Sequence, residues 1–318
     1  MFRKLNKMTP RTKIAVKLLA SHIFLSAGLV IAAVFVRNCD FLLVPVAQTV
    51  LLLVYFAGYW EFFGLRFKNI YFVSLEMVLA TVLVRKLIYG FSGEINLYLL
   101  PILSILQAIM LVQLVKVLIV IFNKDKLFMN IEFPFRGGTY LITDGGNSRI
   151  SRLMNYHYYS PVHRKNKTNL SMLYATDIVR LSDREPLWLP RENGGYPVFG
   201  ENVYSPVDGR ILKTVNDIAD NKPFEEDFPY NTGNTVVIRK DDYYFLLGHL
   251  KEGSIVVKEG DLVKANDLIG TAGNSGWTER PHIHIQQIRS DSEKYWTGTG
   301  VEIRFRGQTL VKNRLIRN

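Results

Sequence analysis

Long apolar runs fill the first 130 residues of the chain and are absent from the remainder. Short polar segments separate four such runs, at residues 14–36, 41–59, 70–90 and 97–122. About 20 apolar residues are enough for a helix to cross roughly 30 Å of hydrocarbon. The pattern therefore predicts that residues 1–130 form an all-α transmembrane region of three or four spans.

The run at residues 70–90 is the least regular of the four. Glu76 lies inside it, and Arg85 and Lys86 interrupt its end. A charge at the centre of a membrane helix costs about 2.5–3.5 kcal/mol on insertion scales. Such a charge marks an ion pathway in some proteins, but we interpret Glu76 as a residue of a bundle-facing or interfacial helix. Whether this run crosses the membrane decides between three and four spans.

Basic residues indicate the orientation of these spans. The chain has 39 Lys and Arg against 28 Asp and Glu, a formal charge of +11; residues 1–130 hold 14 of the basic side chains but only 5 of the acidic ones. Five basic residues precede the first run, which predicts a cytoplasmic N-terminus of a multi-pass membrane protein. Three spans would place the rest of the chain outside the cytoplasm, and four would place it inside.

The second part of the chain, residues 131–318, has a different pattern. Short β-branched and aromatic runs are broken by Gly, Asn, Asp and Pro, which predicts an all-β sandwich or barrel. The predicted strands are 138–143, 175–181, 202–205, 209–215, 235–239, 243–249, 268–272 and 282–288, with a further one at 301–306. The only cysteine, Cys39, excludes an internal disulfide framework. No basic cluster interleaved with aromatic residues suggests a nucleic-acid partner.

Two histidines stand out in the last of the eight main strands. His282 and His284 alternate with apolar residues, so in a strand both imidazoles project from one face. Residues i and i+2 of a strand lie about 6.5–7 Å apart at Cα. That spacing allows one imidazole to bind a metal while the other addresses a water or substrate beside it.

Six short motifs around these histidines carry a family resemblance. They are Val-Tyr-Ser-Pro-Val-Asp-Gly-Arg-Ile-Leu (203–212), Gly-Asn-Thr-Val-Val-Ile (233–238), Gly-His-Leu (248–250), Gly-Asp-Leu-Val-Lys-Ala-Asn-Asp-Leu-Ile-Gly (260–270), Gly-Asn-Ser-Gly (273–276) and Pro-His-Ile-His (281–284). In this order they resemble the lysostaphin/LytM-type zinc endopeptidases over about residues 138–290. The resemblance implies a LytM-like β-sandwich of the barrel-sandwich hybrid type, one Zn²⁺ per chain, and hydrolysis of peptide bonds.

The resemblance also implies roles for single residues. His284 matches a zinc ligand of the family, and His282 and His249 match its two catalytic histidines. Asp177, at the head of a predicted strand, matches a second zinc ligand. The histidine that the family carries four residues before this aspartate is replaced by Leu173.

Three alternatives remain for the third zinc ligand. His157 follows the Gly145-Gly146 turn and resembles the histidine of a divergent branch of these peptidases, so we favour it. His163 lies in a Lys- and Arg-rich stretch that is typical of an exposed loop. The third alternative is that the site has no such ligand.

The leading hypothesis is a membrane-anchored zinc endopeptidase that acts on peptidoglycan cross-links, with its β domain outside the cytoplasm. The alternative is a degenerate, metal-free domain that binds cell-wall peptides or regulates another hydrolase. A transporter with an appended domain is a third hypothesis, but no Gly/Pro-broken helices repeat along the apolar half. The expected partners are the lipid bilayer and peptidoglycan or another peptide, with an unidentified regulatory membrane partner and no nucleic acid.

Overall fold

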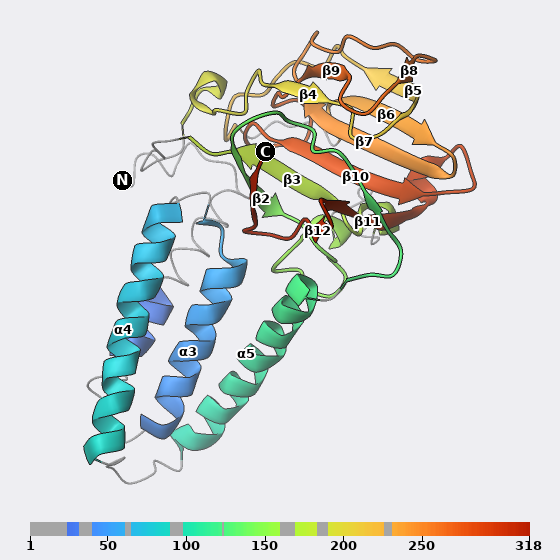
Figure 1. Cartoon of the computed structure of the whole chain (residues 1–318). Helices are drawn as coiled ribbons and strands as arrows, with labels where there is room; N and C mark the ends of the chain where they lie inside the picture. Colours follow the sequence, from blue (N-terminus) through green and yellow to red (C-terminus); the bar gives the residue numbers. More distant parts are fainter. Residues whose placement is uncertain are drawn as a thin grey trace. The chain divides into compact units, whose positions relative to one another are not determined.

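The computed structural model describes residues 24–31, 40–60, 65–89, 98–122, 124–159, 169–182, 190–225 and 231–318. The chain divides into a helical unit, Ile14–Ile119, and a β unit whose main part is Val120–Asn318 (Figure 1). This division lies within a helix, some residues before the boundary that the apolar pattern suggests at residue 130. Each unit is considered separately below.

Among its described residues, the helical unit contains two helices that are long and apolar enough to cross a membrane. Its helices are a segment at residues 24–31, α3 (Asp40–Ala57), α4 (Leu65–Tyr89) and α5 (Leu99–Phe122), the last of which continues into the β unit. The candidate spans are Phe67–Ile88 and Leu100–Phe122. The predicted span at residues 14–36 lies mostly outside the described residues.

The prediction of three to four spans is therefore wrong for the described residues, which hold two. The run at residues 41–59 is the one that falls short, because its helix supplies only the apolar stretch Leu43–Ala57. At about 1.5 Å per residue this stretch covers roughly 22 Å, less than the roughly 30 Å of a hydrocarbon core. The run at residues 70–90, which looked least regular, forms most of α4.

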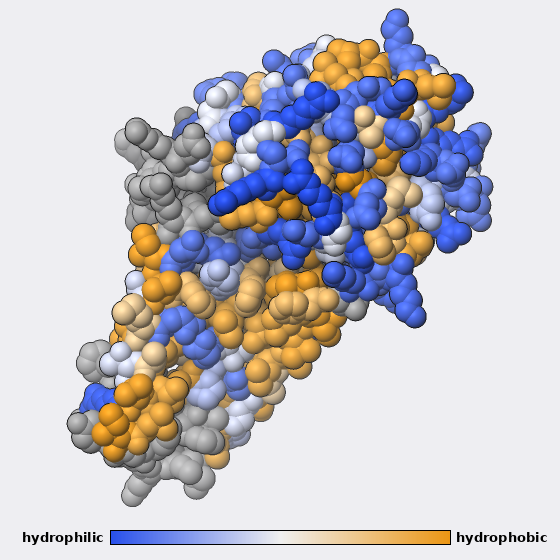
Figure 2. Space-filling model, in the orientation of Figure 1, coloured by the Kyte–Doolittle hydropathy of each residue, from blue (hydrophilic) through white to orange (hydrophobic). Residues whose placement is uncertain are grey.

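Polar side chains inside the helical unit bond between helices. Gln48 of α3 donates to Glu76 of α4 over 2.7 Å, and Gln107 of α5 donates to Thr49 of α3 over 2.9 Å. Glu76 thus faces a neighbouring helix. Large exposed apolar side chains lie along α4 and α5, where Figure 2 shows hydrophobic areas interrupted by polar ones. They include Ile70, Met77, Leu87, Ile102 and Ile105.

After α5, the described residues of the β unit form strands and short 3₁₀ turns, as the alternation of residues predicts. Its strands are β1 (Phe128–Asn130), β2 (Thr139–Asp144), β3 (Thr176–Arg180), β4 (Asn202–Tyr204), β5 (Gly209–Val215), β6 (Asn234–Lys240), β7 (Tyr243–Leu250), β8 (Leu262–Val263), β9 (Leu268–Thr271), β10 (Ile283–Arg289), β11 (Thr299–Phe305), β12 (Gln308–Thr309) and β13 (Leu315–Arg317). The 3₁₀ turns are η2 (His157–Tyr159), η3 (Leu170–Met172), η4 (Asn193–Gly195) and η5 (Tyr295–Thr297).

One large sheet of 11 strands dominates this unit, with the order β13-β2-β3-β10-β7-β6-β5-β8 and with β11 joining β10 to β1 and β12 (Figure 1). Strands β4 and β9 form a separate two-stranded sheet. Val203 of β4 and Ile269 of β9 belong to the same hydrophobic core as Phe245 and Leu247 of β7. The small sheet therefore covers one face of the large sheet.

Along the central strands, the side chains that alternate with the core-facing ones lie on the opposite face of the large sheet. Tyr244 and Leu246 of β7 pack with Ile288 of β10 in a second, smaller apolar cluster. Ile283 and Ile285 of β10 point into the main core. Since strand side chains alternate, His284 must lie on the face opposite the main core.

Candidate metal centre

Strands β3 and β10 bring Asp177 and His284 together. The two strands pair antiparallel, with His284 directly opposite Asp177 in register. Ile178 and Ile283 are fully buried in the main core, so the neighbouring Asp177 and His284 project from the other face. On its other side His284 lies opposite Gly248 of β7, which has no side chain to occupy this face.

His157 of η2 completes a group of three metal-ligand types. Its Nε2 lies 3.3 Å from Asp177 Oδ2, and His284 Nδ1 lies 3.0 Å from Asp177 Oδ1. One ligand atom from each of the three residues lies within 4.8 Å of the others. His284 is 2% exposed, while His157 and Asp177 are 14% and 15% exposed at their side chains, so the group opens to solvent on one side.

The outer nitrogens of these two imidazoles are bonded to side-chain amide oxygens. His157 Nδ1 donates to Asn155 Oδ1 over 2.7 Å, and His284 Nε2 donates to Gln286 Oε1 over 2.9 Å. A neutral imidazole carries one N–H, so the nitrogens that face Asp177 then present lone pairs. In these tautomers the two nitrogens and the carboxylate can bind a cation together; with a proton on the inner nitrogen, His284 instead donates to Asp177 over 3.0 Å.

This donor set fits zinc. Zn²⁺ binds imidazole nitrogen and carboxylate oxygen, and catalytic sites use three protein ligands with one position left open. Two ligand atoms that each lie about 2.0–2.1 Å from a tetrahedral ion are about 3.4 Å apart. Each imidazole nitrogen is near this distance from one carboxylate oxygen, at 3.3 Å from Oδ2 for His157 and 3.0 Å from Oδ1 for His284.

Two further histidines lie beside the group. His282, just before β10, has its Nε2 3.6 Å from Asp177 Oδ1, and His249 lies near the end of β7. The ring of His249 is centred 4.7 Å from that of His282 and 5.8 Å from that of His284. Their Nδ1 atoms donate to backbone carbonyls, of Arg280 over 2.9 Å for His282 and of Ser275 over 2.8 Å for His249. In their neutral forms both present an unprotonated Nε2.

Burial and neighbouring charges set the ionisation of two of these groups. Burial acts to raise the pKa of Asp177, but the adjacent imidazoles of His157 and His282 outweigh it and hold the pKa well below its usual range. Burial, followed by repulsion from His282 and His284, holds the pKa of His249 well below its usual value. At neutral pH the site therefore combines a carboxylate with a neutral imidazole at His249.

The structure brings together all five residues that the sequence nominated: His157, Asp177, His249, His282 and His284. Their individual roles as ligands or catalysts stay predictions. His163 lies outside the described residues. Leu173, which stands where the family has a histidine, follows η3 and does not belong to the group of ligand types.

Sequence reasoning missed Asn155 and Gln286, which bond the outer nitrogens. Each carried a local signal. Gln286 lies two residues after His284, so period-two alternation puts both on one face of β10. Asn155 lies two residues before His157, a spacing at which Asn side chains commonly accept hydrogen bonds from the backbone.

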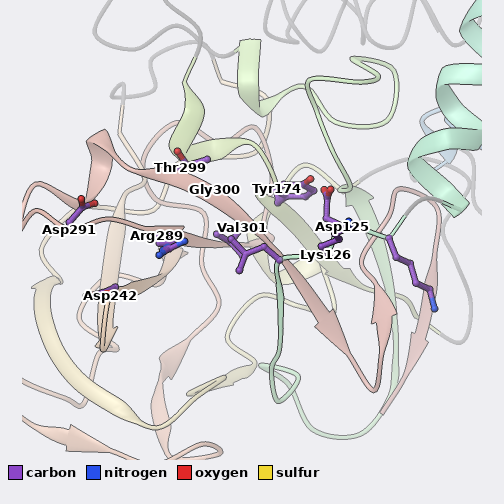
Figure 3. Close-up of a pocket in the computed structure, with 11 residues that line it drawn as sticks. Asp125, Lys126, Tyr174, Asp242, Arg289, Asp291, Thr299, Gly300 and Val301 are labelled. Carbon is purple, nitrogen blue, oxygen red and sulfur yellow. The ribbon is translucent and has the colours of Figure 1, made fainter.

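A separate cavity of about 960 Å³ lies elsewhere in the β unit (Figure 3). It lies between the segment that follows α5 and the strands β10 and β11, and its lining includes Asp125, Lys126, Arg289 and Asp291. Its three cationic and three carboxylate side chains balance one another. None of the five nominated residues lines it, so this cavity is distinct from the candidate metal centre.

Comparison with known protein families adds to this geometry. Residues 196–295 match the model of Peptidase family M23. The matched segment includes His249, His282 and His284, while His157 and Asp177 precede it. The segment 196–295 is thus similar to peptidase family M23. The place of His157 and Asp177 in the site rests on the geometry described above.

Individual proteins align over short segments. Endolysin 2638A of Staphylococcus phage 2638A is 40% identical over 68 residues, which are 20% of this chain and 14% of the endolysin. Peptidoglycan DD-endopeptidase ShyA of Vibrio cholerae is 33% identical over 90 residues, which are 28% of this chain and 18% of the relative. The chain thus spans less than a fifth of the length of either relative. The solved catalytic domain of lysostaphin from Staphylococcus simulans is 20% identical, with a TM-score of 0.29 over 46% of this chain and 86% of that domain.

Proposed function

We propose that the β unit is a zinc-dependent endopeptidase that hydrolyses peptide bonds in peptidoglycan cross-links. The observation that carries this proposal is the convergence of three ligand types on one face of the large sheet. His157, Asp177 and His284 come from segments far apart in sequence, yet their ligand atoms lie within 4.8 Å of one another. His249 and His282 stand beside them.

His157, Asp177 and His284 would hold the zinc ion, through Nε2, a carboxylate oxygen and Nδ1 respectively. Zinc bound there supplies Lewis acidity, which polarises a scissile carbonyl and lets water act as a nucleophile near neutral pH. A substrate would approach from the side of His157 and Asp177, whose side chains are partly accessible to solvent.

His282 and His249 would manage the protons of the reaction. His282 Nδ1 keeps its proton on the Arg280 carbonyl, so Nε2 is the atom that accepts a proton from the attacking water. His249 is held neutral by burial, and its Nδ1 keeps a proton on the Ser275 carbonyl. The two imidazoles can therefore pass the proton to the departing amine while their orientation is maintained.

The names of the relatives support a peptidoglycan substrate, since one is a peptidoglycan endopeptidase and another a phage endolysin. The exposed apolar faces of α4 and α5 support anchoring in a bilayer. Because peptidoglycan lies outside the cytoplasmic membrane, the proposal requires the β unit to be extracytoplasmic. With a cytoplasmic N-terminus, this requires one span in addition to the two candidate spans of the described residues.

The metal-free alternative is favoured by one feature, the leucine at position 173. Against it stands the placement of His157, whose Nε2 reaches Asp177 from a different segment. A domain that only binds peptides has no evident need for four imidazoles with their outer nitrogens all bonded. We therefore favour the enzyme.

The test is hydrolysis of cross-linked peptidoglycan peptides by the full-length chain, purified in detergent. We expect activity that a chelator abolishes and zinc restores, and a loss of about 10²- to 10⁴-fold in His282→Ala. Gln308→Ala, an exposed change on β12, is the control and should leave the rate unchanged. Zinc-loaded wild-type chain that cleaves none of these peptides would refute the proposal.

A further inference from the structure

The buried side chain of Asn155 connects three segments that build the candidate metal centre. Asn155 is fully buried, and its Nδ2 donates to the carbonyls of Gly146 over 2.7 Å and Ala175 over 2.8 Å. Because both amide hydrogens are used, the orientation of the side chain is determined, and Oδ1 must face His157. That oxygen accepts from His157 Nδ1 and from its backbone N–H.

These bonds tie the position of one ligand to that of another. Gly146 follows β2, Ala175 lies two residues before Asp177, and His157 lies in η2. A single carboxamide thus links the segment that carries His157 to the start of the strand that carries Asp177.

Gln286 bonds the outer nitrogen of His284, as Asn155 bonds that of His157. The two residues occupy the same face of β10, and Gln286 is 4% exposed. Its Oε1 lies 2.9 Å from His284 Nε2 and accepts the hydrogen bond. The proton is thereby kept on Nε2, and Nδ1 is the nitrogen that faces Asp177.

Asn155 and Gln286 bond different ring nitrogens, Nδ1 of His157 and Nε2 of His284. His157 faces the site with Nε2 and His284 with Nδ1, so a change of tautomer at either imidazole would turn an N–H toward Asp177 in place of a lone pair. The other two histidines are held by backbone carbonyls, which substitution does not remove.

We propose that Asn155 and Gln286 are positioning residues that fix the tautomers and ring orientations of His157 and His284, and so set the affinity of the site for zinc. This inference rests on the proposed function, in that it takes the ion to be zinc. Outer partners of metal-bound histidines typically contribute about 10- to 100-fold to metal affinity or activity.

The test measures the zinc dissociation constant of the full-length chain in detergent, by competition with a chromophoric chelator, and needs no substrate. We expect Asn155→Ala and Gln286→Leu each to bind zinc about 10- to 100-fold more weakly than wild type. Gln286→Glu keeps an acceptor oxygen and should bind within about threefold of wild type or more tightly, since a carboxylate raises the basicity of the ligand.

The pair of Gln286 variants separates positioning from a purely structural role. A buried leucine is better tolerated in a protein interior than a buried glutamate, so a structural role would make thermal stability and zinc affinity fall together in Gln286→Glu. Positioning instead predicts that Gln286→Leu binds zinc more weakly than Gln286→Glu. This comparison also keeps the proposal testable if Asn155→Ala does not fold.

Asn234→Ala is the matched control for Asn155→Ala. Asn234 is also fully buried and also donates to two carbonyls, those of Ile218 and Leu250, but it bonds none of the three ligand residues. We expect it to lower stability without weakening zinc binding.

Wild-type chain that binds no zinc would refute the proposed function. Wild type that binds zinc while Gln286→Leu binds it equally well, or while Asn234→Ala weakens binding as much as Asn155→Ala, would overturn the inference alone.

Discussion

His249 illustrates how single residues in this site combine backbone and side-chain constraints. Its φ of 60° lies in the left-handed region, where Asn, Asp and His are enriched among non-glycine residues. The backbone there is held on both sides, because His249 N donates to the Thr232 carbonyl and Gly273 N donates to the His249 carbonyl. The side chain is thereby directed toward His282.

This geometry yields a prediction for His249→Asn. Asparagine tolerates a positive φ and can donate from Nδ2 to the Ser275 carbonyl, but it has no second nitrogen to exchange a proton. We expect zinc content to stay at the wild-type level while kcat/KM for peptide hydrolysis falls by about 10²- to 10⁴-fold. Both quantities are measured on the same preparation, and a wild-type rate in this variant would exclude a catalytic role for His249.

At the residue scale, the sequence nominated all five residues of the site, although the support for the third ligand was of a different kind. Four residues could be nominated from motifs, because His249, His282 and His284 lie in short recognisable strings and Asp177 heads a strand. The preference for His157 over His163 rested on the resemblance to a divergent branch, and it stays a prediction because His163 lies outside the described residues. The bonds of Asn155, which place His157 beside Asp177, link two segments that sequence spacing does not relate.

At the scale of elements, the loop before β6 packs directly against the loop that supports His249. Gly233 has a φ of 65°, and a Cβ added there would lie 2.1 Å from the Ser275 carbonyl oxygen. That oxygen accepts the hydrogen bond from His249. Gly253 has nearly the same φ, of 67°, but a Cβ added there would meet nothing within 4 Å.

The two glycines form a matched pair for mutation. In both Gly→Ala changes the alanine must adopt the left-handed conformation, which costs about 1–2 kcal/mol. Gly233→Ala should in addition displace Ser275, so we expect a lower Tm than for Gly253→Ala and a loss of peptide hydrolysis that Gly253→Ala does not show. Thermal unfolding and kinetics of the two full-length variants check this, and equal Tm values would contradict the packing of these loops.

The elements themselves were largely predictable. All eight main predicted strands and the one near the C-terminus are present, because alternating apolar residues and turn residues bound each of them. Strands β1, β8, β12 and β13 were missed. They are only two or three residues long, which is too short for alternation to be recognised.

At the scale of the whole molecule, the number of spans was the hardest feature to predict. Hydropathy located the runs, but the apolar helical stretch within α3 is Leu43–Ala57, which is too short to cross. The charges in the run at residues 70–90 cast doubt on whether this run crosses, yet its helix is one of the two candidate spans. There, Glu76 accepts a hydrogen bond from Gln48, which reduces the cost of burying it within the helical unit.

The proposed substrate makes a topological prediction. A reporter fused after Lys126, just beyond α5, should be extracytoplasmic, since peptidoglycan lies on that side of the membrane. A phosphatase that is active only outside the cytoplasm and a fluorescent protein that folds only inside it give opposite readouts at this position. A cytoplasmic result would exclude peptidoglycan as the substrate, while leaving peptide hydrolysis open.

The zinc content of the full-length chain tests the central claim most directly. The chain, purified in detergent, is equilibrated with zinc, dialysed and analysed for metal per polypeptide. A complete His157, Asp177 and His284 site predicts about one zinc per chain, and almost none in Asp177→Ala under the same conditions. A folded wild-type chain that retains no zinc, or an Asp177→Ala chain that retains as much as wild type, would contradict the account.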